Sequence, residues 1–163
     1  PQYNREPLKK SLRERGIAYV FLGKELGARS EDHSCYEHGK VQYDRLARTD
    51  LFRAGLDRIR NGTEKYQVAL MCAEKEPLEC HRTILVARSL EELGFDVHHI
   101  HADGRAESHA QALSRLIRLL RLSADDMFST RELAVSDAYR IQAERIAYQT
   151  DAPTRGDGRG VAG

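Results

Sequence analysis

The feature that most constrains the fold is a reactive segment placed between a strand pattern and a helix pattern. It runs Cys72-Ala-Glu-Lys-Glu-Pro-Leu-Glu-Cys-His-Arg82. Before it, Tyr66-Gln-Val-Ala-Leu-Met71 is a short apolar run of strand length, and after it apolar residues recur at helical spacing from Ile84 until Gly94. Phe95–Ile100 then predicts another strand. A strand, helix and strand in this order indicate parallel strands joined by a right-handed crossover.

The rest of the chain extends this pattern. Ile17–Leu22 predicts a further strand, and amphipathic or helix-forming segments predict helices over residues 6–15, 43–59, 111–122 and 130–148. The second of these is expected to break near Thr49, with Asp50 capping its continuation. We therefore expect an α/β fold, a three-layer sandwich in which helices flank a mostly parallel sheet. Residues 1–150 would form one domain and residues 151–163 a flexible tail.

Ligands of parallel sheets bind outside the carboxyl ends of the strands, where this reactive segment would lie. A helix beginning near Cys80 would direct its unpaired N–H groups and positive dipole end at the segment. Such a corner attracts anions and stabilises a thiolate, which makes Cys72 and Cys80 candidate catalytic nucleophiles and His81 a candidate acid or base. Alternatively, Cys72 is a small buried filler at the end of a strand.

The expected ligand is a phosphate-bearing or nucleotide-like small molecule, and the reaction would be transfer or hydrolysis. Carboxylates in the same segment oppose an anion site unless they point away or act as acid or base groups. The candidate ligand-binding residues are Lys75, Glu74, Arg82, Tyr43, His99 and His101. A non-catalytic module that binds or senses a nucleotide or nucleic acid remains the competing hypothesis.

The sequence predicts no cofactor, although a Cys/His site for zinc or iron stays open. Cys35 and His38 have a short, ligand-like gap, and the second pair would be Cys72 with Cys80 or the adjacent Cys80-His81. Neither spacing matches a familiar zinc knuckle.

Composition narrows the classes of partner. The 163-residue chain has 26 basic and 25 acidic residues, a net charge of +1, so no global field favours nucleic acid. The stripe of Arg115, Arg118 and Arg121 is typical of a solvated helix face. No apolar run has membrane-spanning length and no signal-peptide pattern opens the chain, while three cysteines suit reduced thiols. These features predict a cytoplasmic protein that does not bind membranes.

The run Ala69–Arg82 resembles the signature of an uncharacterised prokaryotic family, the domain of unknown function 488. Shorter pieces agree in order along the chain to about Tyr148, among them Gly16-Ile-Ala-Tyr19, Gly39-Lys-Val-Gln-Tyr43 and His99-Ile-His-Ala-Asp-Gly104. The resemblance implies a three-layer α/β domain and no settled activity. It also implies that the family's first two strands are missing here, so that the chain is a truncated form. A partner chain, as in a homo-oligomer, would then cover the exposed sheet edge.

Overall fold

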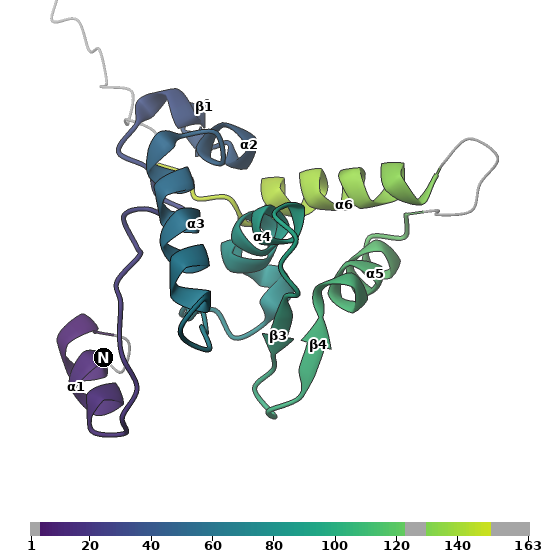
Figure 1. The fold of residues 1–163 in the computed structure, drawn as a ribbon. Helices are drawn as coiled ribbons and strands as arrows, with labels where there is room; N and C mark the ends of the chain where they lie inside the picture. Colours follow the sequence, from purple (N-terminus) through teal and green to yellow (C-terminus); the bar gives the residue numbers. More distant parts are fainter. Residues whose placement is uncertain (1–3, 123–129, 151–163) are drawn as a thin grey trace, which may run out of the picture.

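The computed structural model describes residues 4–122 and 130–150 (Figure 1). Residues 1–3 and the expected tail, residues 151–163, lie outside this part of the chain. The α-helices are α1 (Arg5–Arg13), α2 (Tyr43–Leu46), α3 (Asp50–Thr63), α4 (Arg88–Glu92), α5 (His109–Leu119) and α6 (Arg131–Ile146). Short 3₁₀ turns are η1 (His33–Cys35) and η2 (Pro77–Glu79), and η3 (Arg82–Ala87) is a π-helical segment. The strands are β1 (Tyr36–Glu37), β2 (Lys40–Val41), β3 (His98–Ile100) and β4 (Ala106–Ser108).

The mixture of helices and strands is confirmed, but the mostly parallel three-layer sandwich is wrong. In the described residues the strands form two antiparallel pairs, β1 with β2 and β3 with β4. In the second pair His99 lies opposite Glu107. The connection after β3 is a short turn in which Gly104 adopts a φ of +85°, and a turn of this length returns the chain antiparallel. A parallel neighbour would need a crossover of a dozen or more residues.

Two expected strands, Ile17–Leu22 and Tyr66–Met71, contain neither strand nor helix in the structure. A strand exists only when a second strand satisfies its backbone groups, and none of the described residues pairs with these segments in a ladder. Several of their apolar side chains face solvent, with Val20 61% and Tyr66 69% exposed. The expected strands at these two segments are therefore wrong, because the described residues supply no partner strand for them.

The helices follow local sequence signals closely. The expected break near Thr49 separates α2 from α3, and the Thr49 hydroxyl accepts a hydrogen bond from the Phe52 N–H at 3.2 Å. Thr49, rather than the expected Asp50, is therefore the N-cap of α3. Ser108 caps α5 in the same way and forms a reciprocal capping box with Gln111. The helical stretch that follows Cys80 ends, as expected, before Gly94, which has a φ of +85°.

One hydrophobic core joins α2, α3, η3, α4, α5 and α6. The η3 segment is central to it, because Thr83 to Ala87 are all buried. Helix α6 runs alongside η3 and α5, and the buried Gln142 of α6 donates a hydrogen bond to the Leu78 carbonyl at 2.8 Å. Helix α1 contributes no buried residue and lies apart from these helices (Figure 1). None of the helices in the described residues is long and apolar enough to span a membrane.

Candidate metal centre

Four side chains of the reactive segment converge on one point. One donor atom from each lies within 4.8 Å of the donor atoms of the other three. The four residues are Cys72, Glu74, Cys80 and His81. Among the described residues this is the one group of histidine, cysteine and acidic side chains packed closely enough to hold a metal ion.

The backbone between the two cysteines explains how residues eight positions apart meet. Pro77–Glu79 forms a 3₁₀ turn that opens with the Glu76 carboxylate accepting the Leu78 N–H at 3.2 Å. Cys80 is then extended, with φ −123° and ψ 134°, and its sulfur accepts the Arg82 N–H at 3.3 Å. The turn folds the segment back on itself, and the Cys80 sulfur lies at the start of the helical stretch.

Arg82 fixes the other side of the site. Its guanidinium Nη1 donates to the Leu70 carbonyl at 3.3 Å, just before Cys72 in the chain. This bond ties the Tyr66–Met71 segment to the beginning of η3 and so positions Cys72 against His81. Arg82 thus supports the arrangement of the cluster through backbone contacts, and its positive charge also acts on Cys80.

The distances between donor atoms resemble those around one tetrahedral ion. Cys72 Sγ lies 3.8 Å and Cys80 Sγ 4.0 Å from His81 Nδ1. Cys80 Sγ lies 3.4 Å from Glu74 Oε2. Zinc lies about 2.3 Å from sulfur and about 2.0 to 2.1 Å from imidazole nitrogen, so such ligands of one ion are about 3.6 Å apart.

The two thiols differ in burial, and their mutual contact makes them differ in acidity. Cys80 is fully buried, whereas Cys72 and His81 are half-buried and Glu74 is exposed, so one side of the cluster faces solvent. The hydrogen bond from Cys80 lowers the pKa of the Cys72 thiol far below its usual range, and His81 acts in the same direction. The same contact, together with burial, raises the pKa of Cys80. Of the two thiols, Cys72 is therefore the more acidic.

Tyr43, at the start of α2, belongs to the surroundings of the cluster. Its side chain is buried, and its hydroxyl has no hydrogen-bond partner in the structure. Burial raises the pKa of Tyr43, and the nearby Cys80, Glu74 and Cys72 raise it further. A buried hydroxyl without a partner is unusual, because leaving it unpaired costs free energy. The hydroxyl thus lies close to three of the four side chains of the cluster, Cys80, Glu74 and Cys72.

The remaining predicted site residues lie elsewhere. Lys75 is exposed, and no hydrogen bond or ion pair joins it to another described residue. Cys35 is buried and neither it nor His38 joins the cluster. The structure therefore offers no metal site from the Cys35 and His38 pair within the described residues.

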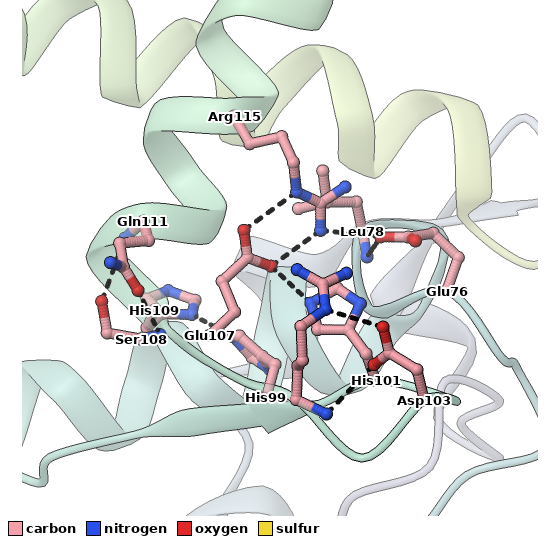
Figure 2. A network of polar contacts seen from close by, with 11 residues as sticks. Glu76, Leu78, His99, His101, Asp103, Glu107, Ser108, His109, Gln111 and Arg115 are labelled. Atoms are coloured by element: carbon pink, nitrogen blue, oxygen red, sulfur yellow. Dashed lines mark hydrogen bonds and ion pairs between the residues drawn. The ribbon is translucent and has the colours of Figure 1, made fainter.

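His99 and His101 belong to a different polar network, shown in Figure 2. His99 is buried, and its Nε2 lies 2.8 Å from Nδ1 of His109. His101 Nε2 lies 2.9 Å from Glu107, and the same carboxylate accepts two hydrogen bonds from Arg115. Neither Glu107 nor Arg115 carries a sequence signal for this pairing, because their contacts join the hairpin to α5. The Ser108 to Gln111 capping spacing is the one local clue in this region.

Comparison with known protein families connects the cluster to a family. The model of the domain of unknown function DUF488 matches residues 1–89. The chain belongs to the DUF488 family. No curated protein and no solved structure matches the chain. The DUF488 match contains all four donors and Tyr43, whereas most of the network in Figure 2 lies beyond its last residue.

Proposed function

We propose that this DUF488 protein binds a thiophilic divalent metal ion, such as zinc or ferrous iron, through Cys72, Glu74, Cys80 and His81. The convergence of the four donor atoms within 4.8 Å carries the proposal. Thiolate, imidazole and carboxylate are the usual ligands of zinc, and mixed sets of sulfur and nitrogen also hold iron. The unpaired Tyr43 hydroxyl supports it, since a ligand in the cluster would give this group a partner.

Exposure on one side favours a catalytic over a purely structural role. Structural zinc sites are closed by protein ligands, whereas catalytic sites keep a position for water or substrate. Glu74 is exposed and thus the donor most easily displaced by an incoming molecule. A metal ion there would act as a Lewis acid for hydrolysis or group transfer. The protein's own part is to position the donors, through the Arg82 contacts and the turn at Pro77.

A cysteine-dependent transferase or hydrolase without metal is the second candidate. The half-buried Cys72 sulfur, 3.8 Å from His81 Nδ1, has the arrangement of a nucleophile beside a proton carrier. Cys72 would attack the substrate and form a covalent bond, His81 would protonate the leaving group, and water would release the product. A non-catalytic module that senses a nucleotide remains the third hypothesis, in which neither thiol reacts.

Reduced thiols favour a reducing, cytoplasmic location for either chemistry, because both require Cys72 and Cys80 as thiols or thiolates. All three cysteines of the structure are free. A phosphate-bearing small molecule is the proposed substrate class. Homo-oligomer formation is proposed on the exposed apolar side chains of the Ile17–Leu22 and Tyr66–Met71 segments.

The test measures metal content and the absorption of a cobalt-substituted protein. Purified full-length protein should hold about one metal ion per chain, and Co²⁺ should produce a thiolate charge-transfer band and tetrahedral d–d bands. Cys72→Ser and His81→Gln should weaken metal binding by tenfold or more, as the loss of a ligand does. Cys35→Ser is the matched control, because Cys35 is a buried thiol outside the cluster.

Two results decide between the candidates. The metal proposal would be wrong if the wild-type protein binds no metal. It would also be wrong if Cys35→Ser loses as much metal affinity as Cys72→Ser and His81→Gln. Rapid alkylation of Cys72 by iodoacetamide at neutral pH, unaffected by a chelator, would then favour the nucleophile. If Cys72 and Cys80 react no faster than a model thiol and no metal binds, the sensing hypothesis remains. Half-buried Cys72 is the preferred ligand for substitution, because the fully buried Cys80 also contributes to the core. Cys35 is likewise a core residue, so Cys35→Ser also reports the effect of lost packing alone.

A further inference from the structure

A cavity of about 680 Å³ lies beside the β3–β4 hairpin, between α5 and the start of α6. Its walls come from three regions: residues 101–107 of the hairpin, one face of α5, and Arg131 of α6. Glu76 closes the side that leads to the cysteine segment, two residues after the proposed metal ligand Glu74. A volume of this order is that of a pocket for a small-molecule ligand.

The lining is rich in arginine. Four guanidinium groups, from Arg105, Arg115, Arg118 and Arg131, face two carboxylates. The whole chain has a net charge of only +1, so the excess of positive charge is a local property of this cavity. Among the described residues, no carboxylate pairs with Arg118 or Arg131, and Arg131 donates to the Ser114 hydroxyl at 3.2 Å.

The two carboxylates of the lining are already engaged. Arg115 forms a two-point contact with Glu107, at 2.9 and 2.8 Å, and also lies 2.9 Å from Glu76. His101 lies 2.9 Å from Glu107 on the other side (Figure 2). The Arg115 contacts lower the pKa of Glu107 to about 2, so this carboxylate stays charged and holds the wall together. Arg105 pairs with Asp103 at 2.6 Å, which leaves Arg118 and Arg131 as the lining arginines without a carboxylate partner among the described residues.

We infer that this cavity binds a phosphate-bearing small molecule through Arg118 and Arg131, with Arg105 at its rim. Guanidinium groups bind phosphate oxygens by charge-assisted, often two-point hydrogen bonds. The fixed Arg115, Glu107 and His101 wall keeps the site in place before the ligand arrives. The site is separate from the cysteine cluster, and its ligand binding does not depend on a metal ion there.

The shape favours a small molecule over nucleic acid. A nucleic-acid backbone is followed by cations along an extended groove, usually with aromatic side chains between them. The cations here surround one cavity, and none of its lining residues is aromatic apart from the engaged His101. Arg121, the third arginine of the stripe in the sequence, follows the end of α5 and does not line the cavity.

The probe is inorganic pyrophosphate, titrated calorimetrically into full-length protein as purified and at constant ionic strength. We expect saturable binding that Arg118→Gln and Arg131→Gln each weaken by about tenfold, since each removes a charge-assisted contact. Arg121→Gln is the control, because it changes the net charge equally and lies outside the cavity. Its affinity should stay within about twofold of the wild type, because solvent and salt screen an exposed charge that does not line the cavity.

Three outcomes would overturn the inference. Pyrophosphate fails to bind the wild type at millimolar concentration, or Arg121→Gln loses as much affinity as the cavity variants. The third outcome is that a single-stranded oligonucleotide binds tightly while pyrophosphate does not bind, which would assign the arginines to nucleic-acid binding. If a metal ion in the cysteine cluster held the pyrophosphate, its binding would be lost in Cys72→Ser and retained in Arg118→Gln. The two variants therefore distinguish failure of this inference from failure of the metal proposal.

Discussion

At the scale of single residues, Tyr43 offers a test of the metal proposal. Its hydroxyl is buried beside Cys72 and Cys80 and has no hydrogen-bond partner among the described residues. A hydroxyl in this state destabilises the fold, because it has lost water and gained nothing in return. Metal binding in the adjacent cluster would bring polar groups within its reach.

Removal of this hydroxyl should therefore stabilise the metal-free protein and not the metal-loaded one. We expect Tyr43→Phe to raise the free energy of unfolding of chelator-treated protein by about 1 kcal/mol, the cost of one unpaired buried hydroxyl. In zinc-loaded protein the gain should vanish. Urea unfolding with and without zinc measures both values.

Tyr66→Phe supplies the control for this substitution. Tyr66 is 69% exposed, so its hydroxyl is free to bind water in both states. Its replacement should change the free energy of unfolding by less than about 0.5 kcal/mol. A destabilised Tyr43→Phe protein in the absence of metal would show that the hydroxyl already has a partner.

At the scale of elements, α3 depends on one small residue where it meets the preceding turn. A methyl group added at Gly55 would lie 2.7 Å from Cβ of Glu25 and 2.7 Å from the side chain of the buried Leu26. The Leu26 N–H donates to the Leu22 carbonyl at 2.8 Å, so this turn is itself fixed. The helix and the turn can pack only because position 55 has no side chain.

Two alanine substitutions in the same helix should consequently have opposite effects. Gly55→Ala should lower the free energy of unfolding by about 1 to 3 kcal/mol through overpacking, in spite of the better helix propensity of alanine. Gly62→Ala meets only Val68, at 3.5 Å, and should stabilise the protein by about 0.5 to 1 kcal/mol. Chemical denaturation compares the two. Equal stabilisation would mean that the turn at Leu26 moves aside without cost.

At the scale of the whole molecule, a buried chain of polar groups joins three elements. His99 of β3 contacts His109 of α5, and His109 Nε2 lies 2.7 Å from the Tyr139 hydroxyl of α6. Burial lowers the pKa of His99 to about 4, and burial followed by the charge of His99 lowers that of His109 to about 4. In the folded chain both histidines are therefore neutral at pH 7.

Acid should therefore weaken the fold before the carboxylates titrate. In the unfolded chain, His99 and His109 bind protons near the ordinary histidine pKa of 6.5. In the folded chain they bind protons only near pH 4. The stabilisation is complete above about pH 7 and falls as the pH drops from about 6.5 towards 4. Between pH 7.5 and pH 5 we expect a loss on the order of 2 kcal/mol per histidine, measured by urea unfolding.

His98 provides the comparison for this pH dependence. It lies next to His99 on the other side of the strand, with its side chain 49% exposed. His99→Gln should reduce the loss of stability by about half, while His98→Gln should leave it unchanged. A wild-type protein equally stable at pH 7.5 and pH 5 would show that the buried histidines accept protons without unfolding.

The helices were the predictable part of the fold. Helical hydrogen bonds join residues four apart, so capping residues such as Thr130 and helix-ending residues such as Gly94 carry their information locally. That Ile17–Leu22 and Tyr66–Met71 form no strands was not predictable in this way. A strand needs a partner distant in sequence, and an apolar run does not say whether one is there.

The sequence by itself determined the helix positions, the DUF488 membership and the concentration of reactive side chains between Cys72 and Arg82, because these depend on residues close together in the chain. Tertiary structure alone decided that Glu74 joins the two cysteines and His81 around one point, while His99 and His101 turn away to α5. It also decided that arginines of the hairpin, α5 and α6 share one cavity. Each of these outcomes depends on how separate elements pack against the core, and spacing along the chain does not encode that directly.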